Sequence, residues 1–188
     1  MKTVDEVLSR GVTQIIEEKD LRENLSSGRR LRIKFGVDPT GPRIHLGRAI
    51  PMWKLKAFQD MGHTIVFLIG DFTARIGDAS DKTAERPMLT KEDVEKNLEG
   101  YLDQVGKILD VSRCEVVYNS DWLSKLSFEE VSRLADSFSV AEMLDRDNFS
   151  KRYEGGERIS LREFMYPLMQ GYDSVAVEAD VELGGNDQ

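Results

Sequence analysis

The fold of this chain is decided by the stretch Thr64-Ile65-Val66-Phe67-Leu68-Ile69, a continuous apolar run. Such a run is typical of a strand buried on both faces, as in a parallel sheet. Upstream, Leu31-Arg32-Ile33-Lys34-Phe35-Gly36-Val37 alternates apolar and polar residues at a period of two, which predicts a second strand. Cys114-Glu115-Val116-Val117-Tyr118 predicts a third strand.

The segments around these strands predict helices. Apolar residues from Val4 to Ile16 recur at helical spacing, although Gly11 interrupts them, and residues 21–25 predict a second short helix. A helix is expected to begin after His45 and to end at Gly62, and Pro51 would be tolerated only in or near its first turn.

Capping boxes mark the later helices. The run Thr90-Lys91-Glu92-Asp93 predicts the start of one amphipathic helix that reaches Leu109, and boxes at Ser127 and Ser160 begin two more. Strands that alternate with helices of this length need crossover connections and a parallel sheet. The sequence therefore predicts an α/β fold with a doubly wound parallel sheet.

Composition limits the classes of function. The 188 residues, 40% hydrophobic, suffice for one domain spanning 1–188. A net charge of -8 excludes a broad basic surface for nucleic acid, so an RNA partner would bind through a local patch or through parts outside this chain. The single cysteine, Cys114, allows no intrachain disulfide, and no Cys/His cluster has metal-ligand spacing. Without a signal peptide or a membrane-spanning apolar stretch, we expect a cytoplasmic protein.

Ligands of an open parallel sheet bind at the carboxyl ends of the strands, and three segments fall there. The first segment, Asp38-Pro39-Thr40-Gly41-Pro42-Arg43-Ile44-His45-Leu46-Gly47-Arg48, brings a histidine and a glycine to a helix N-terminus, where phosphate is favoured. The imidazole of His45 can donate to a phosphate oxygen, or it can simply belong to a helix cap.

The second segment, Gly70-Asp71-Phe72-Thr73-Ala74-Arg75-Ile76-Gly77-Asp78-Ala79-Ser80, follows the buried strand with glycines and carboxylates. It is either part of a site or a surface loop with Asx-turns. Lys82 and Arg86 beyond it lie four apart, so on a helix they would share a face and could address one anion.

The third segment places Tyr166, Gln170 and Asp173 on one helical face, followed by Gly184-Gly185-Asn186-Asp187-Gln188. A polar face with so many apolar neighbours either lines a pocket or meets solvent. Asp180 and Glu182 are expected to face solvent.

Together the three segments resemble the class I tyrosyl-tRNA synthetases of bacteria, over the whole chain. His45-Leu46-Gly47-Arg48, preceded by Asp38-Pro39-Thr40, corresponds to the HIGH-type signature, and the run from Tyr166 to Ala176 with Gly184 to Gln188 is specific to this family. The resemblance implies a Rossmann-like nucleotide-binding fold, incomplete at the C-terminus because the KMSKS loop and the anticodon-binding domain lie beyond Gln188. It also implies a tyrosine–tRNA ligase that uses ATP with Mg²⁺ as substrate and has no tightly bound cofactor. Its partners would be tyrosine, ATP, tRNA(Tyr) and a second copy in a homodimer.

The resemblance also implies residue roles. Asp173 would accept the hydrogen bond of the substrate phenol, while other polar residues would hold the rest of the amino acid. These tyrosine-binding residues are Asp78, Tyr166, Gln170 and Gln188. The catalytic set that stabilises the phosphates would be Thr40, His45, Arg48, Lys82 and Arg86. The ATP-binding set would be Asp38, His45, Gly47, Arg48, Gly185 and Asp187.

Departures from the family pattern are few. Arg48 replaces the second histidine of the signature and cannot accept a hydrogen bond. Asn186 stands where Thr or Ser is usual, Ala79 where Pro is common, and Lys34 where some members have tyrosine at the phenol pocket. The chain is expected to bind tyrosine but to be deficient in catalysis. Two alternatives stay open, a binding module that turns over neither tyrosine nor ATP, and the related tryptophanyl enzyme.

Overall fold

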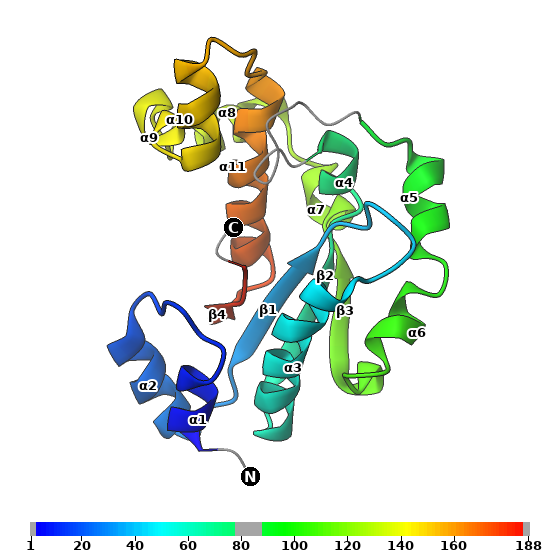
Figure 1. Cartoon of the computed structure of the whole chain (residues 1–188), viewed down its shortest axis with the longest axis vertical. Coiled ribbons are helices and arrows are strands. Elements are labelled where there is room, and N and C mark those ends of the chain that lie inside the picture. Colours follow the sequence, from blue (N-terminus) through cyan, green and yellow to red (C-terminus); the bar gives the residue numbers. More distant parts are fainter. Residues whose placement is uncertain (1–2, 78–87, 186–188) are drawn as a thin grey trace.

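A four-stranded parallel sheet forms the centre of the molecule, with the strand order β3-β2-β1-β4 (Figure 1). The structure is a computed structural model, and it describes residues 3–77 and 88–185. The strands are β1 (Arg32–Val37), β2 (Thr64–Ile69), β3 (Cys114–Tyr118) and β4 (Val181–Glu182). The chain adds β2 and β3 on one side of β1 and then crosses over to place β4 on the other side of β1. This change in the order of strands makes the structure a doubly wound α/β fold, as predicted.

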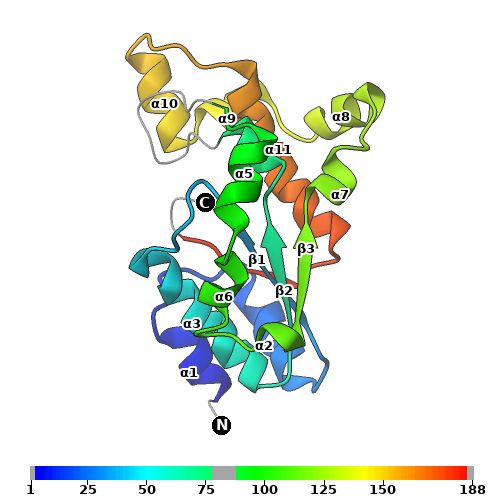
Figure 2. The same ribbon diagram turned by 90° about the vertical axis from the view of Figure 1, so that its right-hand side faces the viewer.

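Helices cover both faces of the sheet. α1 (Val4–Ser9), α2 (Glu18–Ser26) and α3 (Leu46–Asp60) lie on one side, and α11 (Leu161–Ala176) lies on the other (Figures 1 and 2). Two short helices, α4 (Thr73–Ile76) and α7 (Ser120–Leu123), lie near the carboxyl ends of the strands. Three more, α8 (Phe128–Ala135), α9 (Val140–Leu144) and α10 (Asp147–Glu154), lie at the top of Figure 1. α5 (Lys91–Leu98), α6 (Tyr101–Val105) and the 3-10 turn η1 (Val111–Arg113) connect β2 to β3.

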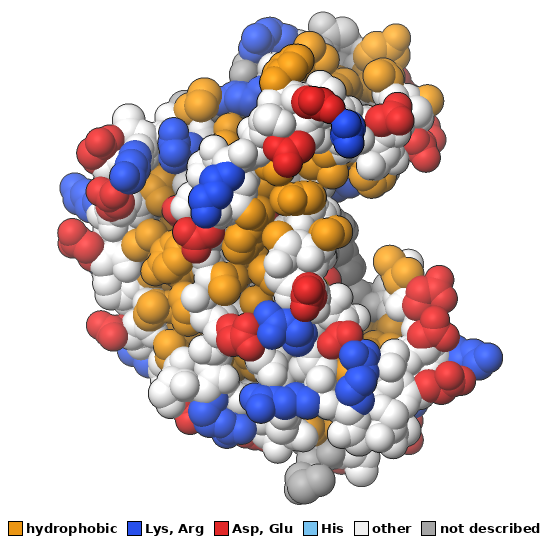
Figure 3. All heavy atoms as spheres, turned by 180° about the vertical axis from the view of Figure 1, so that it is seen from behind, with side chains coloured by type: hydrophobic (Ala, Val, Ile, Leu, Met, Phe, Trp, Pro, Cys, Tyr) orange, Lys and Arg blue, Asp and Glu red, His pale blue; other side chains and the backbone are white. Residues whose placement is uncertain are grey.

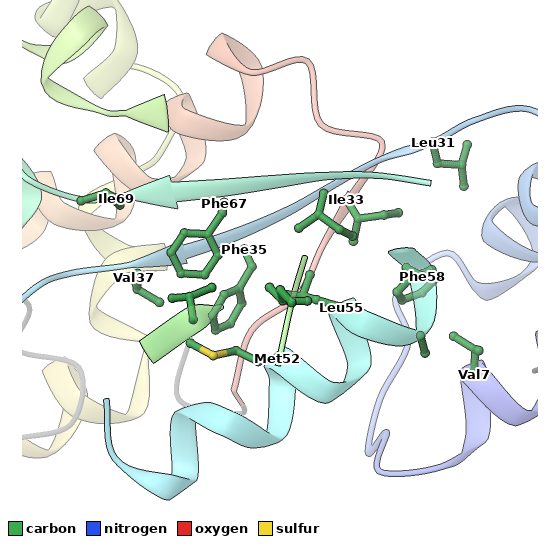
Figure 4. Close-up of a cluster of buried hydrophobic side chains, with 14 of the residues drawn as sticks. Val7, Leu31, Ile33, Phe35, Val37, Met52, Leu55, Phe58, Phe67 and Ile69 are labelled. Atoms are coloured by element: carbon green, nitrogen blue, oxygen red, sulfur yellow. The ribbon is translucent and has the colours of Figure 1, made fainter. Parts of the chain in front are cut away.

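The main core lies between the sheet and α3 (Figure 4). β1 and β2 pair in register from Arg32↔Thr64 to Val37↔Ile69, so alternate side chains of the two strands point to the same face. The odd-numbered side chains pack against α3. This cluster includes Ile33, Phe35, Val37, Ile65, Phe67 and Ile69 of the strands and Met52, Leu55 and Phe58 of α3.

The opposite face of the sheet is less apolar. Val66 and Leu68 of β2 form a small cluster there with Val177, while β1 contributes Lys34 and Gly36. Lys34 is 1% exposed, and its ammonium contacts α11. The face between β1 and α11 is therefore half-polar, unlike the apolar face that packs against α3.

Three helix expectations need correction. The single helix predicted from Thr90 to Leu109 is broken between α5 and α6, because Gly100 adopts a left-handed conformation with φ +65. α1 ends at Ser9, before Gly11 at φ +66, so the apolar residues beyond Gly11 lie outside the helix. Pro51 lies at the sixth residue of α3, past the first turn, where the N–H it lacks would have bonded the exposed Gly47.

A buried ion pair fastens α10 to α11. Arg152 Nη1 donates to Glu163 Oε1 at 2.6 Å, and both side chains are at most 3% exposed. The N–H of Ser160 also donates to Glu163 at 2.8 Å, completing a capping box. Burial alone would raise the pKa of Glu163, but the bonds from Arg152 and Ser160 outweigh it and hold that pKa below its ordinary value.

We expect Glu163→Gln to lower the free energy of unfolding by about 3–5 kcal/mol, because it removes the buried counter-ion of Arg152 and leaves the exposed Glu157 carboxylate, 4.0 Å away. Glu129→Gln is the matched control, since Glu129 pairs with Arg133 on the exposed surface of α8 and such pairs contribute about 0.2–1 kcal/mol. Urea unfolding of the three proteins measures both. Equal losses of unfolding free energy for the two variants would show that the buried ion pair contributes no more to stability than the exposed one.

His63 gives the fold a dependence on pH. Its Nδ1 accepts the Leu31 N–H at 3.2 Å, which only an unprotonated nitrogen can do. Burial, with a smaller effect from Arg30, lowers the pKa of His63 below its ordinary value of 6.5. The unfolded chain therefore binds more protons than the native state below about pH 6.5, so His63 makes stability fall as pH decreases.

We expect His63→Asn to flatten this slope, because the Asn Oδ1 can accept the same N–H without titrating. The measurement is the difference in unfolding free energy between pH 7.5 and pH 5.5 for both proteins. Identical slopes for wild type and His63→Asn would contradict the assignment.

Candidate functional site

Asp38, just past the end of β1, joins the first and third predicted segments. Tyr166 of α11 donates its hydroxyl to Asp38 Oδ2 at 3.0 Å, across 128 residues of sequence. Thr73 of α4 donates to Asp38 Oδ1 at 2.7 Å, which adds the second segment. The three segments that the sequence placed at the carboxyl ends of the strands therefore meet at one carboxylate.

Gly70 is required by this arrangement. A Cβ at Gly70 would lie 2.0 Å from Asp38 Oδ1 and 2.4 Å from Thr73 Oγ1, distances that no real side chain shows. The backbone leaving β2 therefore passes directly against the Asp38 carboxylate. Glycine permits this approach because it has no side chain.

Asp173 of α11 is buried, with 3% of its surface exposed. Asn119 Nδ2 donates to Asp173 Oδ2 at 3.1 Å, and Trp122 Nε1 donates to Asp173 Oδ1 at 2.8 Å. Asn119 Nδ2 also donates to Thr73 Oγ1 at 2.9 Å. A continuous hydrogen-bonded chain therefore runs from Tyr166 through Asp38, Thr73 and Asn119 to Asp173.

Burial raises the pKa of Asp173 to about 6. The hydrogen bonds from Asn119 and Trp122 and the charge of Lys34 act in the opposite direction and limit the rise. Asp173 is consequently ionised at neutral pH, and each of its oxygens already has one donor. Such a carboxylate can accept one further hydrogen bond from a ligand hydroxyl without rearranging.

Lys34 ties β1 to α11 and β4. Its ammonium donates to Gln170 O at 3.1 Å, to Ser174 Oγ at 2.9 Å and to Glu182 Oε1 at 3.0 Å. Glu182 was expected to face solvent. Its side chain is 38% exposed, but it forms this ion pair with a buried lysine.

The HIGH-type segment lies at the N-terminus of α3. His45 is its N-cap, and Nδ1 of the exposed imidazole accepts the Gly47 N–H at 3.1 Å. Thr40 is exposed and donates its N–H to Asp38 O at 2.8 Å. Arg48 is half-buried and donates through Nη1 to Asp38 O at 3.0 Å and to Tyr101 Oη at 3.2 Å.

Some predicted residues cannot be placed. Asp78, Lys82, Arg86, Asp187 and Gln188 lie outside the described residues. Gly185 is described, and it is exposed in the segment that follows β4. Within residues 3–77 and 88–185, no group of three His, Cys, Asp or Glu side chains could hold a metal ion. In the same ranges, no helix has the length and apolarity needed to cross a membrane.

Sequence reasoning missed Asn119 and Trp122. Asn119 directly follows β3 and is fully buried, with its Oδ1 accepting the Phe72 N–H at 3.0 Å. Its position at the carboxyl end of a third strand was the available signal. Trp122 offered none, because its indole reaches Asp173 only through the tertiary fold.

One face of the molecule has mixed charge and a hollow. On the face shown in Figure 3, acidic and basic side chains are interspersed and form no continuous patch of one sign. The same view shows the molecule hollowed between the lobe of α9 and α10 and the lobe of α1 and α2.

Comparison with known proteins points to one family. The model of the tRNA synthetases class I (W and Y) matches residues 26–188. The chain is 56% identical to the Tyrosine--tRNA ligase 2 of Vibrio vulnificus over 181 residues, which are 96% of this chain and 46% of the relative. It is 52% identical to the Tyrosine--tRNA ligase of Haemophilus influenzae over 188 residues, covering 100% of this chain and 47% of that one. The chain thus spans about half the length of these relatives.

Solved structures agree with the sequence comparison. A C-terminally truncated mitochondrial tyrosyl-tRNA synthetase of Aspergillus nidulans has a TM-score of 0.82 and 28% identity, over 97% of this chain and 57% of that one. The equivalent Coccidioides posadasii protein has a TM-score of 0.80 and 30% identity, over 97% and 54%. With a family model that matches most of its length and a sheet that carries the site at the switch between β1 and β4, the chain belongs to the class I tRNA synthetases of the tryptophan and tyrosine group.

Proposed function

We propose that this chain is the tyrosine-binding and ATP-binding part of a tyrosine–tRNA ligase. The observation that carries the proposal is the buried Asp173 carboxylate, held by Asn119 and Trp122 beside the half-polar face of β1. A preorganised acceptor of this kind suits a phenol hydroxyl. The names of the bacterial relatives favour tyrosine over tryptophan.

The amino acid would bind along α11. Asp173 would accept the phenol O–H, and the α-ammonium would be held by Tyr166, Gln170 and Asp78, with Gln188 contacting the amino acid nearby. The bond from Tyr166 to Asp38 supports this arrangement, because it fixes the Tyr166 hydroxyl near the carboxyl ends of the strands. The contacts proposed for tyrosine lie within this chain, so we expect the chain to bind tyrosine.

ATP would bind at the HIGH-type segment, with its phosphates near the N-terminus of α3, where N–H groups and the helix dipole favour anions. Thr40, His45, Arg48, Lys82 and Arg86 would stabilise the phosphates. Asp38, Gly47, Gly185 and Asp187 would hold the rest of the nucleotide, and Mg²⁺ would enter bound to the phosphate oxygens.

The reaction needs no covalent bond to the protein. The tyrosine carboxylate attacks the α-phosphorus of ATP and forms tyrosyl-adenylate, and the bond to the leaving pyrophosphate breaks. The protein contributes by holding the two substrates in line and by stabilising the charge that moves onto pyrophosphate. Transfer of tyrosine to tRNA(Tyr) is proposed for the complete protein.

A homodimer in the cytoplasm is part of the proposal. The segment from α8 to α9, which follows β3, exposes large apolar side chains, with Phe128 87%, Phe138 51% and Val140 65% exposed. A second copy that covers these side chains would remove them from water. The half-buried thiol of Cys114 fits a reducing compartment.

The proposal predicts discrimination between tyrosine and phenylalanine. Phenylalanine would leave the buried Asp173 acceptor without its ligand partner, at a cost of about 1–3 kcal/mol, so it should bind roughly 5- to 150-fold more weakly. Calorimetry with both amino acids measures this. Asp173→Ala should narrow the gap, whereas Asp121→Ala, an exposed carboxylate on α7, should preserve it. Equal binding of both amino acids to wild type would overturn the role of Asp173.

Tyrosine affinity should also depend on the ionisation of Asp173. With a pKa of about 6, the carboxylate is about one-tenth ionised at pH 5, so tyrosine should bind roughly tenfold more weakly there than at pH 7.5. A protonated Asp173 oxygen would itself be a hydrogen-bond donor, so it would also weaken the hydrogen bond that it accepts from Asn119 or Trp122. Phenylalanine is the control ligand, because it shares the ammonium and carboxylate of tyrosine but lacks the phenol. A pH dependence that is the same for both ligands would assign the effect to other groups.

A further inference from the structure

Three side chains on α5 and α6 hold the loop that leads into α3. Asn97 Nδ2 donates to Pro39 O at 2.9 Å. Gln104 Nε2 donates to Pro42 O at 2.9 Å, and Gln104 Oε1 accepts the Ile44 N–H at 3.0 Å. Tyr101 Oη accepts from Arg48 Nη1 at 3.2 Å. We call Asn97, Tyr101, Gln104 and Arg48 the loop clamp, and Figure 1 shows the loop after β1 reaching the junction of α5 and α6.

The clamp acts on the backbone of the loop. Asn97 bonds the Pro39 carbonyl, and Gln104 bonds main-chain atoms of Pro42 and Ile44 in the loop as well as the Gly100 carbonyl of its own helix start. Arg48 bonds the Asp38 carbonyl and Tyr101. Gln104 satisfies one carbonyl and one N–H two residues apart, which fixes the direction of the chain between them. Loop backbone held at so many points loses little further freedom when a ligand binds.

The clamp is anchored in the hydrophobic core. Tyr101 and Val105 of α6 are 1% exposed, and Val94 of α5 is 2% exposed. Asn97 and Gln104 lie between these residues and are half-buried. The break at Gly100 separates α5 from α6, yet both helices turn side chains toward the same loop. The loop is therefore fixed to a rigid part of the molecule.

We propose that the loop clamp consists of positioning residues for nucleoside triphosphate binding, which set the backbone of residues 38–47 before ATP arrives. The inference rests on the proposed function, because it takes that loop as the ATP site. It assigns Arg48 a bridging contact between α3, Asp38 and α6. The guanidinium can reach Tyr101 and a carbonyl together because it is a donor with several N–H groups, whereas an imidazole has at most two.

The clamp should affect ATP more than tyrosine. Among the described residues, Asn97 and Gln104 form no hydrogen bond with α11 or with Asp173, whereas Arg48 bonds Asp38, whose carboxylate holds Tyr166. Gln104 is therefore the cleaner position to test. A variant that loses loop positioning should raise the KM for ATP while the tyrosine Kd stays constant.

The experiment is tyrosine-dependent pyrophosphate exchange, with tyrosine calorimetry, on the complete protein. Gln104→Ala should raise the KM for ATP roughly tenfold, because two positioning bonds are lost. Gln104→Glu should fall between wild type and Gln104→Ala, since it keeps the acceptor for Ile44 but loses the donor to Pro42. The tyrosine Kd should stay within about twofold in both. Asp103→Ala is the matched control, an exposed neighbour on α6, and should behave as wild type.

The outcomes separate the two proposals. An unchanged KM for ATP in both Gln104→Ala and Asn97→Ala would overturn the clamp alone. Equal weakening of tyrosine and ATP, together with a lowered Tm, would also overturn it, because that pattern is a general loss of structure. A wild-type protein that exchanges no pyrophosphate and binds no ATP would overturn the proposed function and this inference with it.

Discussion

The geometry of the site depends on the hydrogen bonds that Asp38 accepts. Its carboxylate accepts hydrogen bonds from the hydroxyls of Thr73 and Tyr166. Its backbone carbonyl accepts hydrogen bonds from the Thr40 N–H and from the Arg48 guanidinium. These donors come from α4, α11, the loop after β1 and α3. One residue at the end of β1 therefore sets the distance between the loop proposed for ATP and the helix proposed for tyrosine. This constraint also explains the glycine at position 70, because any side chain there would displace the Asp38 carboxylate.

The face of the sheet that carries the site is built at a cost in stability. Lys34, Asn119 and Asp173 are each at most 3% exposed, and burying such groups is unfavourable unless they are hydrogen-bonded. The raised pKa of Asp173 records that cost. The opposite face, with its continuous apolar packing against α3, supplies the stabilisation that offsets it. Division of the sheet into an apolar face and a half-polar face follows from the parallel register of β1 and β2, which aligns alternate side chains of the two strands.

Much of the site could be predicted from the order of residues along the chain. Asp38, Tyr166 and Asp173 were singled out because they follow strands or share a helix face, and they lie in one hydrogen-bonded chain. The interruption at Gly100 was not predicted, since the apolar spacing continues through it. Asn119 could have been found from its place after β3. The sequence could not reveal the roles of Trp122, Glu182 and the loop clamp. Each of them contacts a partner more than 50 residues away, or a stretch of backbone whose path the sequence does not specify.

The sequence by itself determined the order of the three main strands and the presence of helices between them, because hydrophobic period, capping boxes and glycines act over a few residues. It also determined which face of β1 is apolar, since alternation along a strand fixes the direction of each side chain. Only the tertiary structure decided which polar groups satisfy one another. The ionisation of Asp173 depends on burial, on the donors Asn119 and Trp122 and on the charge of Lys34, and the bonds of Arg48 depend on where α6 packs. Electrostatic and hydrogen-bonding energies depend on distances between atoms, and folding alone brings residues from distant parts of the chain within those distances.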